Sequence, residues 1–574
     1  MLRVRVKVQI LAAALLLSCG LGAAQARDFA APRLTLAKVD WEAALAALDK
    51  VDALKDRVAK TGSDGEAPDT VETFERLNRA TSAALANIAA SPVPVLLPFD
   101  LIGFLRARDQ AADEPAAKPF TIFNAPKLFL PGPAGYDAAF SFRAREVAEF
   151  SGIDFKEDVE IQITGAAFHY ELDHTVKLEA KPIALEAQFP GIRRGYLQSH
   201  MRYIFTRHGV SYTVSILCFD GASRAKRLSC READPIALRF LASLQLVGGT
   251  PQPLMPSVDP ALLERPAETA RDFIYVAPGH LIAGTGYRKH GGRADATVYT
   301  ALRFPLAVGP AHVYSQMFMY SGDCAGVDNP RTLRRGGALF RCQNDEKKDD
   351  KKDDKAADAA SALAPTAPPV YLPVYPWRDN FCETRDFSVG QCPAGWGHQG
   401  EDIVPAHCAF EGDKNRCDAQ RLALVAVHSG TILRAPGQEG LVIVVNTPDA
   451  HLRFRYLHMD PKALDAAGLI SGRVVSAGDP IGKISNFSGH EDGTSHHLHF
   501  DMQVLTRDGW ILANPYATLV SAYERLIGAR GEERIDPLSV SGAALAVSHP
   551  LFTRPVKVKR RLVKRRIKYR RAGR

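Results

Sequence analysis

The chain has 574 residues, 46% of them hydrophobic and 24% charged, a balance that excludes a wholly disordered or fibrous protein and suits about two to four domains. Residues 554–574 carry twelve Lys or Arg and no acid, so subtracting 12 from the formal net charge of +8 leaves −4 for the rest of the chain. The body of the protein is therefore mildly acidic, and the basic character belongs to a C-terminal tail.

Residues 1–26 have the features of a secretory signal peptide. Basic residues precede an apolar run over residues 8–17, and Ala24-Gln25-Ala26 supplies a small-residue cleavage site. The apolar run is too short to predict a transmembrane helix. We therefore expect an exported mature chain in the periplasm or the extracellular envelope. A second interpretation stays open, because Leu16-Leu17-Ser18-Cys19 is similar to a bacterial lipoprotein box and would make Cys19 a lipidated N-terminus.

The cysteines agree with export. Apart from Cys19 there are eight, and they follow one another as near neighbours, which favours short disulfide loops in an oxidising compartment. The sequential pairs are Cys218 with Cys230, Cys324 with Cys342, Cys382 with Cys392, and Cys408 with Cys417. Many other pairings are possible, so local closure is a preference and not a deduction.

A helical hairpin is predicted over residues 27–90. From Trp41 onward, apolar residues recur at the spacing of amphipathic helices and are interrupted by Gly62-Ser63-Asp64-Gly65. The apolar face either packs on the next domain or docks a partner as a coiled coil. The first alternative is favoured because a hairpin this short needs tertiary support.

Residues 91–250 are predicted to form a β-rich accessory domain. Short alternating runs such as Val159–Ile163 and Tyr212–Ile216 are typical of an antiparallel sheet. Residues 235–246 are predicted to form a closing helix. This segment contains no cluster of His, Asp, Glu or Cys at the spacing of metal ligands, so its role, structural or substrate-positioning, stays open.

Two stretches of biased composition divide the rest of the chain. Residues 251–272 are proline-rich and predict a linker. Residues 345–369 combine charge blocks with an Ala and Pro run, which predicts a disordered insertion. Sequence with paired cysteines lies on both sides of the insertion, so we place it inside a domain, as a lid or as a tolerated surface insertion.

Residues 273–530 form the next predicted domain, with 531–574 as a C-terminal extension. Strands are predicted at 423–427, 431–434, 441–445, 452–457, 481–484 and 498–504, separated by glycine-containing turns, and a helix is predicted at 516–527. The pattern indicates an antiparallel all-β unit with a terminal helix. The whole chain is thus predicted to be a multidomain α+β protein.

Two histidine motifs lie in this domain, His398-Gln399-Gly400-Glu401-Asp402 and His497-Leu498-His499, with His458 between them. On a strand, His497 and His499 would point to the same face. Catalytic zinc takes three protein ligands from His, Asp or Glu and keeps one position open, and His398, Asp402 and one histidine of the pair supply that number. The imidazole left over is suited to accept and return a proton beside a zinc-bound water.

The segments HQGED, YLHM, GDPIGKIS and SHHLHF resemble the LytM or lysostaphin type of zinc metallopeptidase, over residues 395–515. The resemblance implies that His398, Asp402 and His499 bind one Zn²⁺ and that His458 and His497 are catalytic. It also implies that the domain cuts peptides of bacterial peptidoglycan. Residues 27–270 lie outside it.

Five other histidines lie near these motifs, and most of them are expected at the surface or beside the metal ligands: His407, His428, His451, His490 and His496. His496 is the main rival of His497, because a register shift of one residue would turn it to the opposite face of the sheet.

The resulting prediction is an exported zinc endopeptidase that hydrolyses peptide cross-links of peptidoglycan. The alternative is a catalytically silent LytM-like scaffold that binds the wall or activates a separate amidase. All five site positions are filled, which favours the enzyme. The basic tail is expected to bind an anionic wall or membrane surface, and export argues against nucleic acid as its partner.

Overall fold

The computed structural model describes residues 29–49, 69–110, 119–120, 122–173, 185–219, 227–281, 285–307, 377–385, 387–403, 409–411, 414–416, 423–494 and 496–534. Several predicted features lie outside these residues. They are the signal peptide (1–26), Cys19, the insertion at 345–369, the basic tail at 554–574, and the pairs Cys324 with Cys342 and Cys408 with Cys417.

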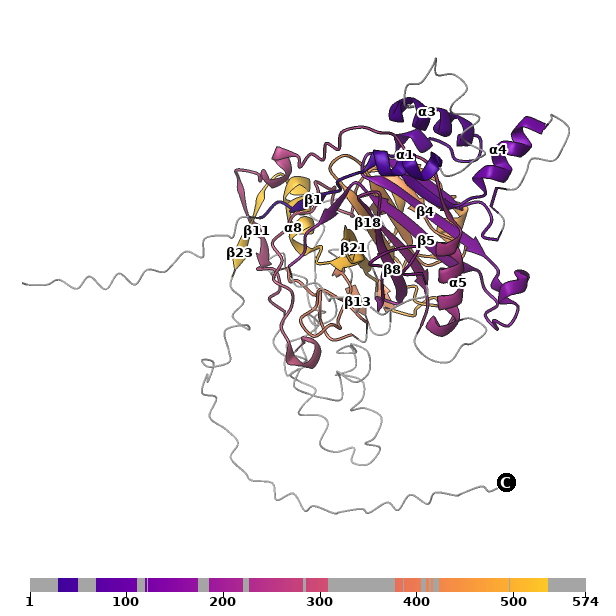
Figure 1. Cartoon of the computed structure of the whole chain (residues 1–574). Coiled ribbons are helices and arrows are strands. Elements are labelled where there is room, and N and C mark those ends of the chain that lie inside the picture. The colour runs from indigo at the N-terminus through magenta and orange to yellow at the C-terminus, as the bar shows by residue number, and fades with distance from the viewer. Residues whose placement is uncertain are drawn as a thin grey trace, which may run out of the picture.

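The N-terminal half is arranged around an antiparallel sheet of six strands in the order β3-β4-β5-β9-β8-β7 (Figure 1). Beside it, β1 pairs with β6, and β2 with β10. The helices are α1 Trp41–Asp49, α3 Thr70–Thr81, α4 Leu101–Gln110 and α5 Cys230–Ala242, with 3-10 turns η2 Ile88–Ala90, η3 Ala144–Glu146 and η4 Ala148–Phe150. The strands are β1 Leu34–Leu36, β2 Val95–Pro98, β3 Leu128–Gly132, β4 Gly135–Phe142, β5 Val159–Ala166, β6 Phe168–Tyr170, β7 Arg193–Leu197, β8 His200–Arg207, β9 Val210–Leu217 and β10 Leu244–Gly248.

The region predicted as a helical hairpin contains both helices and one strand. Trp41 of α1 packs edge-on against Phe74 of α3, with ring centroids 4.7 Å apart. Asp69 caps α3 by accepting a hydrogen bond from the backbone N–H of Val71. The residues before α1 are not helical: β1 pairs with β6, so this segment joins the following domain by backbone hydrogen bonds. That pairing, and the burial of Phe74, support packing of the hairpin region on its own chain.

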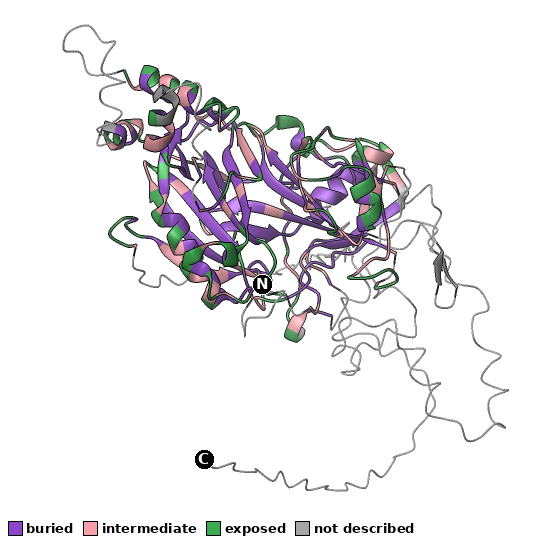
Figure 2. Ribbon diagram, turned by 90° about the vertical axis from the view of Figure 1, so that its right-hand side faces the viewer, coloured by how far each residue is buried: buried purple, intermediate pink, exposed green. Residues whose placement is uncertain are grey.

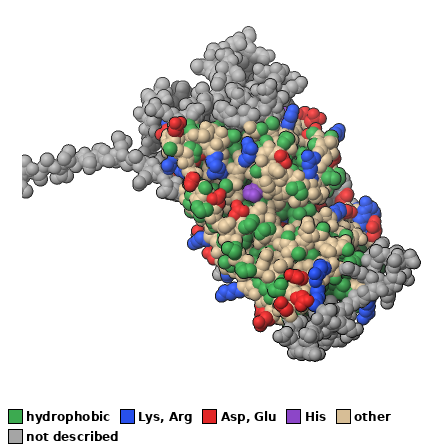
Figure 3. Space-filling view, turned by 90° about the horizontal axis from the view of Figure 1, so that it is seen from above, with side chains coloured by type: hydrophobic (Ala, Val, Ile, Leu, Met, Phe, Trp, Pro, Cys, Tyr) green, Lys and Arg blue, Asp and Glu red, His purple; other side chains and the backbone are tan. Residues whose placement is uncertain are grey.

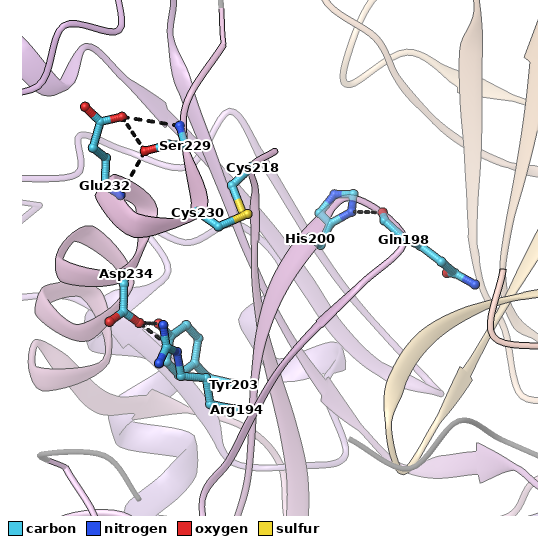
Figure 4. The surroundings of a disulfide bond; sticks show 9 residues. All are labelled: Arg194, Gln198, His200, Tyr203, Cys218, Ser229, Cys230, Glu232 and Asp234. Atoms are coloured by element: carbon cyan, nitrogen blue, oxygen red, sulfur yellow. Dashed lines mark hydrogen bonds and ion pairs between the residues drawn. A yellow bond between two sulfur atoms is a disulfide. The ribbon is translucent and has the colours of Figure 1, made fainter. Parts of the chain in front are cut away.

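The closing helix of this half begins and ends earlier than predicted. α5 starts at Cys230 because Ser229 and Glu232 form a capping box, in which the Glu232 backbone N–H donates to Ser229 Oγ and the Glu232 carboxylate accepts from Ser229 (Figure 4). The helix ends at Ala242, and the last predicted helical residues belong to β10. Cys230 is bonded to Cys218, which confirms this predicted disulfide and ties α5 to the end of β9.

The C-terminal half contains a second antiparallel sheet, of seven strands, in the order β12-β21-β18-β17-β16-β19 with β22 added beside β21. Its strands are β12 Glu401–Ile403, β16 Gly430–Leu433, β17 Leu441–Asn446, β18 His451–Leu457, β19 Val474–Val475, β21 Leu498–Thr506 and β22 Gly509–Ala513. Smaller pairs are β13 Ala409–Glu411 with β14 Lys414–Arg416, β15 Ala423–Val425 with β20 Pro480–Lys483, and the parallel pair β11 Thr269–Val276 with β23 Arg530–Arg534. The remaining helical elements are η5 Pro260–Leu263, η6 Tyr287–Lys289, α7 Pro461–Ala466 and α8 Tyr516–Ile527.

The predicted strands of this half are present within one or two residues, and α8 has the predicted bounds. The stretch predicted as a linker is more ordered than expected. It contains η5, whose Leu262 is buried, and the start of β11. Arg265 from this stretch forms a buried ion pair with Glu524 of α8, with Nε and Oε2 2.8 Å apart. Arg265 therefore ties this stretch to the C-terminal helix.

The two large sheets face each other through polar side chains. In the six-stranded sheet, the alternation of side chains turns Tyr136, Phe140 and their equivalents toward the helices, where Phe140 and Phe240 of α5 lie 5.2 Å apart. The opposite face carries Asp137 and Gln162, which contact the second sheet. Buried residues run through both layers (Figure 2), and one hydrophobic cluster includes residues of both halves.

Asp137 is the charged centre of this interface. Its Oδ1 accepts from Arg453 Nη2 at 2.9 Å, and its Oδ2 lies 2.8 Å from His451 Nε2. Burial raises the pKa of Asp137, but His451 and Arg453 outweigh burial and hold that pKa below its ordinary range. Arg453 also lies over the Trp510 ring, 3.9 Å from its centroid. His451, expected at the surface or beside the metal ligands, is instead wholly buried between the sheets.

On the face seen in Figure 3, the basic and acidic side chains of the described residues are interspersed among apolar and polar ones. They are not gathered in one place as the buried charges around Asp137 are. Among the described residues, no helix has both the length and the apolar character needed to cross a membrane.

Replacing Asp137 by alanine should destabilise the protein by about 3–5 kcal/mol, because it leaves Arg453 buried without an acidic partner. Chemical denaturation measures the loss. The matched control is Asp158→Ala, which removes an exposed acid that pairs with Lys127 and Arg143 and should cost about 1 kcal/mol or less. Equal losses in the two variants would contradict the assigned role of Asp137.

Acid should destabilise the protein through buried neutral histidines such as His169. Burial, with His451 and Arg507, lowers the pKa of His169 to about 4. The unfolded chain binds this proton near pH 6.5 and the folded one only near pH 4, so stability falls as pH drops through this window, by at most about 1.4 kcal/mol per pH unit for one histidine. Thermal melting at pH 7 and pH 5 should show a smaller loss in His169→Gln than in wild type. The exposed-site control His290→Gln should match wild type, and a full wild-type loss in His169→Gln would refute the assignment.

Candidate metal centre

Strand register brings the two histidine motifs together. β12 pairs antiparallel with β21 so that Asp402 lies directly opposite His499, and opposite residues of paired strands point to the same face. His398 lies three residues before the first residue of β12, Glu401. Gly400 is needed between them, because a Cβ at this position would lie 2.2 Å from the carbonyl oxygen of Phe500 in β21. The HxGxD spacing thus reflects a close approach of two backbones.

Three donor atoms converge on this face. His398 Nε2 lies 2.9 Å from His499 Nδ1 and 3.3 Å from Asp402 Oδ1, and His499 Nδ1 lies 3.0 Å from Asp402 Oδ1. All three residues are at most 6% exposed. The two histidines and the aspartate could together hold a metal ion.

Outer hydrogen bonds set the tautomers of both histidines. His398 Nδ1 lies 3.0 Å from the carbonyl oxygen of Asn380, and His499 Nε2 lies 3.3 Å from Asp501 Oδ2. Protons on these outer nitrogens leave lone pairs on His398 Nε2 and His499 Nδ1, which face each other. Arg455 Nε in turn donates to Asp501 Oδ2 at 2.5 Å. Such carboxylate and carbonyl partners are typical of metal-binding histidines.

The donor set fits a divalent cation such as Zn²⁺. Two imidazole nitrogens and one carboxylate are a ligand set of catalytic zinc, and ligands at 2.0–2.1 Å in a tetrahedron are about 3.3 Å apart, close to the separations found here. Burial raises the pKa of Asp402, yet His398 and His497 hold it well below its ordinary range, so the carboxylate is ionised. Burial lowers the pKa of His398, which keeps that imidazole neutral. Asp402 and His398 are therefore in their metal-binding protonation states. Burial lowers the pKa of His499, but Asp402 and Asp501 outweigh burial and raise it, so a cation bound there would displace a proton from that imidazole.

A disulfide holds the backbone beside His398. Cys382 and Cys392 are bonded, which confirms the second predicted pair within the described residues. The Cys382 N–H donates to the carbonyl oxygen of His398 at 3.0 Å, and the His398 N–H donates to that of Glu383 at 2.8 Å. The disulfide-bonded loop thus forms hydrogen bonds with both the backbone N–H and the backbone carbonyl of His398.

The predicted catalytic histidines lie next to the three donors. The rings of His458 and His497 are 4.7 Å apart, and that of His458 is 6.2 Å from His499. His497 Nε2 lies 3.5 Å from Asp402 Oδ1. The structure thus brings all five predicted residues to one place. His496 is only partly buried and is not part of this group.

His458 has an unusual backbone conformation for its type. It follows directly after β18 with φ of 65°, a left-handed conformation that costs a non-glycine residue free energy and that is often found at functional sites. Its Nδ1 lies 2.9 Å from the carbonyl oxygen of Phe487, which leaves Nε2 as an acceptor. Burial, with His497 and His499, lowers the pKa of His458 to about 4. The imidazole is therefore neutral at pH 7.

Sequence reasoning missed the residues that orient the ligands, namely Asn380, Asp501 and Arg455. Asp501 had a detectable signal, because it follows His499 by two residues on a strand and so shares its face. Asn380 and Arg455 reach the site only through the fold.

Comparisons with known proteins add little to this geometry. No family model and no curated protein matches the chain. A solved structure from Ruminococcus gnavus, described as a "putative glycyl-glycine endopeptidase lytM", matches with 23% identity over 23% of this chain and 48% of that one, with a TM-score of 0.17. The chain thus spans about half the length of that structure. A TM-score this low does not establish a shared fold, so the site is interpreted from its own residues.

Metal-stripped protein should bind one Zn²⁺, and Asp402→Ala should abolish this binding because it removes the only carboxylate among the three donors. Asp501→Asn should weaken the affinity by about 10- to 100-fold, the usual effect of losing an outer partner of a ligand histidine. Calorimetric titration measures both. Asp492→Ala, an exposed acid in the loop before β21, is the control and should bind as wild type does; equal binding by all four proteins would rule out this site.

Proposed function

We propose that the protein is a zinc-dependent endopeptidase that hydrolyses peptide cross-links of bacterial peptidoglycan. The observation that carries the proposal is the convergence of His398, Asp402 and His499 with His458 and His497 on one face of the seven-stranded sheet. Three protein donors leave a fourth position for water or substrate, which is the arrangement of a catalytic metal site and not of a closed structural one.

Bound Zn²⁺ would polarise the scissile carbonyl and lower the pKa of the attacking water. The neutral His458 is assigned the role of proton acceptor, because its Nδ1 is engaged by Phe487 and its Nε2 keeps a lone pair. His497, beside both His458 and Asp402, is assigned the stabilisation of charge on the carbonyl oxygen. His458, having taken a proton from the attacking water, would return it to the leaving amine. Asn380 and Asp501 hold the ligand histidines in the required tautomers.

The substrate class and the compartment are also proposals. They rest on the signal-peptide features of residues 1–26, on the two disulfides of the described chain and on the resemblance of the motifs to LytM-type peptidases. An exported enzyme of this chemistry would meet wall peptides in the periplasm or envelope, and the basic tail would hold it at an anionic wall or membrane surface.

Access to the centre favours one direction of approach. His398, Asp402, His497 and His499 are buried, whereas His458 is only partly so. We therefore propose that a peptide approaches the site from the side of His458. The burial of the other four residues also fits the scaffold alternative. A silent domain or a latent enzyme would bind metal at this site without cutting a peptide.

Zinc-loaded mature protein should remove cross-linked dimers from purified peptidoglycan, with the products resolved by mass, and His499→Ala should not. His458→Ala should still bind zinc but cut about 100-fold more slowly or worse, because it loses only the proton acceptor. The control is His490→Ala, an exposed histidine nearby. Zinc binding and wall retention without cleavage would instead support the scaffold.

A further inference from the structure

A polar cavity lies between the two large sheets, on the same face of the seven-stranded sheet as the candidate metal centre. The space in it that water-sized groups can occupy is about 60 Å³. One wall is formed by β18, β21 and β22, and the other by β5, β9, β8 and the turn before β8. The accessory half therefore contributes one whole wall of the cavity.

The cavity is lined by three arginines and by no acidic residue. Two of the arginines are compensated by neighbouring acids, since Arg453 pairs with Asp137 and Arg455 with Asp501. The third, Arg202, forms no ion pair among the described residues. Burial and Arg453 lower the pKa of Arg202 by more than Asp508 raises it, and Asp508 is itself paired with Arg193.

Arg202 is a buried cation whose donors are mostly unused. It is 3% exposed, and its Nη2 donates to Gln198 Oε1 at 3.3 Å. Its Nε and Nη1, like Gln198 Nε2, find no acceptor among the described protein atoms. Burial lowers the pKa of Arg202 to about 9, so it stays charged at pH 7. A buried guanidinium without an anion is costly, and its planar fork fits a carboxylate.

The cavity is connected to the metal centre by hydrogen bonds. Arg455, at its rim, donates to Asp501 Oδ2, the partner of His499, and to Gln399 Oε1, the neighbour of His398. Gln399 and Arg455 are both partly exposed. Along β21, Gln503 of the cavity lies four residues beyond His499, so the cavity is about 13 Å from the metal donors at about 3.3 Å per residue.

We propose that this cavity binds a carboxylate of the peptide substrate, with Arg202 as its charge partner, and so selects peptides that carry an acidic group three or four residues from the cleaved bond. The proposal rests on the proposed function for the identity of the substrate. It makes the accessory half a specificity element, an alternative that its sequence left open.

Two synthetic cross-link peptides test the proposal, identical except that one carries a carboxylate and the other a carboxamide at that position. Wild-type protein loaded with zinc should cut the carboxylate peptide with a kcat/KM at least about tenfold higher. Arg202→Met should bring the ratio close to one, and Arg145→Gln, which removes an exposed arginine of the same half, should keep the wild-type ratio. Equal cleavage of both peptides by wild type, or an unchanged ratio in Arg202→Met, would overturn the proposal.

Binding separates this proposal from the proposed function. If wild type cuts neither peptide, the endopeptidase fails, and calorimetric titration of both peptides into the full chain decides the rest. Tighter binding of the carboxylate peptide, lost in Arg202→Met, supports the cavity as a peptide site. Binding of free glutarate but of neither peptide, or no binding at all, contradicts it. Arg202→Met should melt at the wild-type temperature or above, because no ion pair is lost.

Discussion

The period-two alternation of β18 and β21 places a continuous polar row on one face of the seven-stranded sheet, and the rest of the structure depends on how that row is covered. His499, Asp501 and Gln503 share this face with Arg455, Arg453 and His451 across the strand pair. A sheet packed on one side only can leave such a face in water. Here the face is buried along much of its length, so each polar group requires a partner.

Three kinds of partner meet this requirement. At the far end, the six-stranded sheet supplies Asp137 and Gln162, which bind Arg453. At the near end, His398 and Asp402 converge with His499 in a geometry that suits a cation. Between them, Arg455 joins Asp501 to Gln399, while Arg202 faces a cavity without a counter-ion. The polar groups along this row are thus compensated in different ways: by a structural ion pair, by a candidate metal site and by a proposed anion site.

In this arrangement the N-terminal accessory half positions one sheet relative to the other. A polar interface between two sheets is a weak source of stability compared with apolar packing, because desolvation offsets much of the Coulombic attraction. It fixes relative position well, since hydrogen-bonded partners leave little freedom of register. The disulfides act in the same sense at both ends, one joining α5 to β9 and the other bracing the loop that pairs with His398. The wall of the cavity is therefore held in place relative to the metal donors.

The sequence by itself determined most of the C-terminal sheet, the limits of α8 and two disulfides, and it singled out five candidate site residues that the fold brings together. These follow from local signals: alternation, glycine turns, cysteine proximity and motif spacing. It misplaced α5, where the capping box at Ser229 outweighed periodicity, and it could not foresee that His451 lies between two sheets. The sequence also contained no signal for the roles of Asn380, Arg455 and Arg202. Their roles depend on contacts between segments far apart in the chain, and only the tertiary structure, by stacking one polar face upon another, decided which of these side chains are buried and which groups they meet.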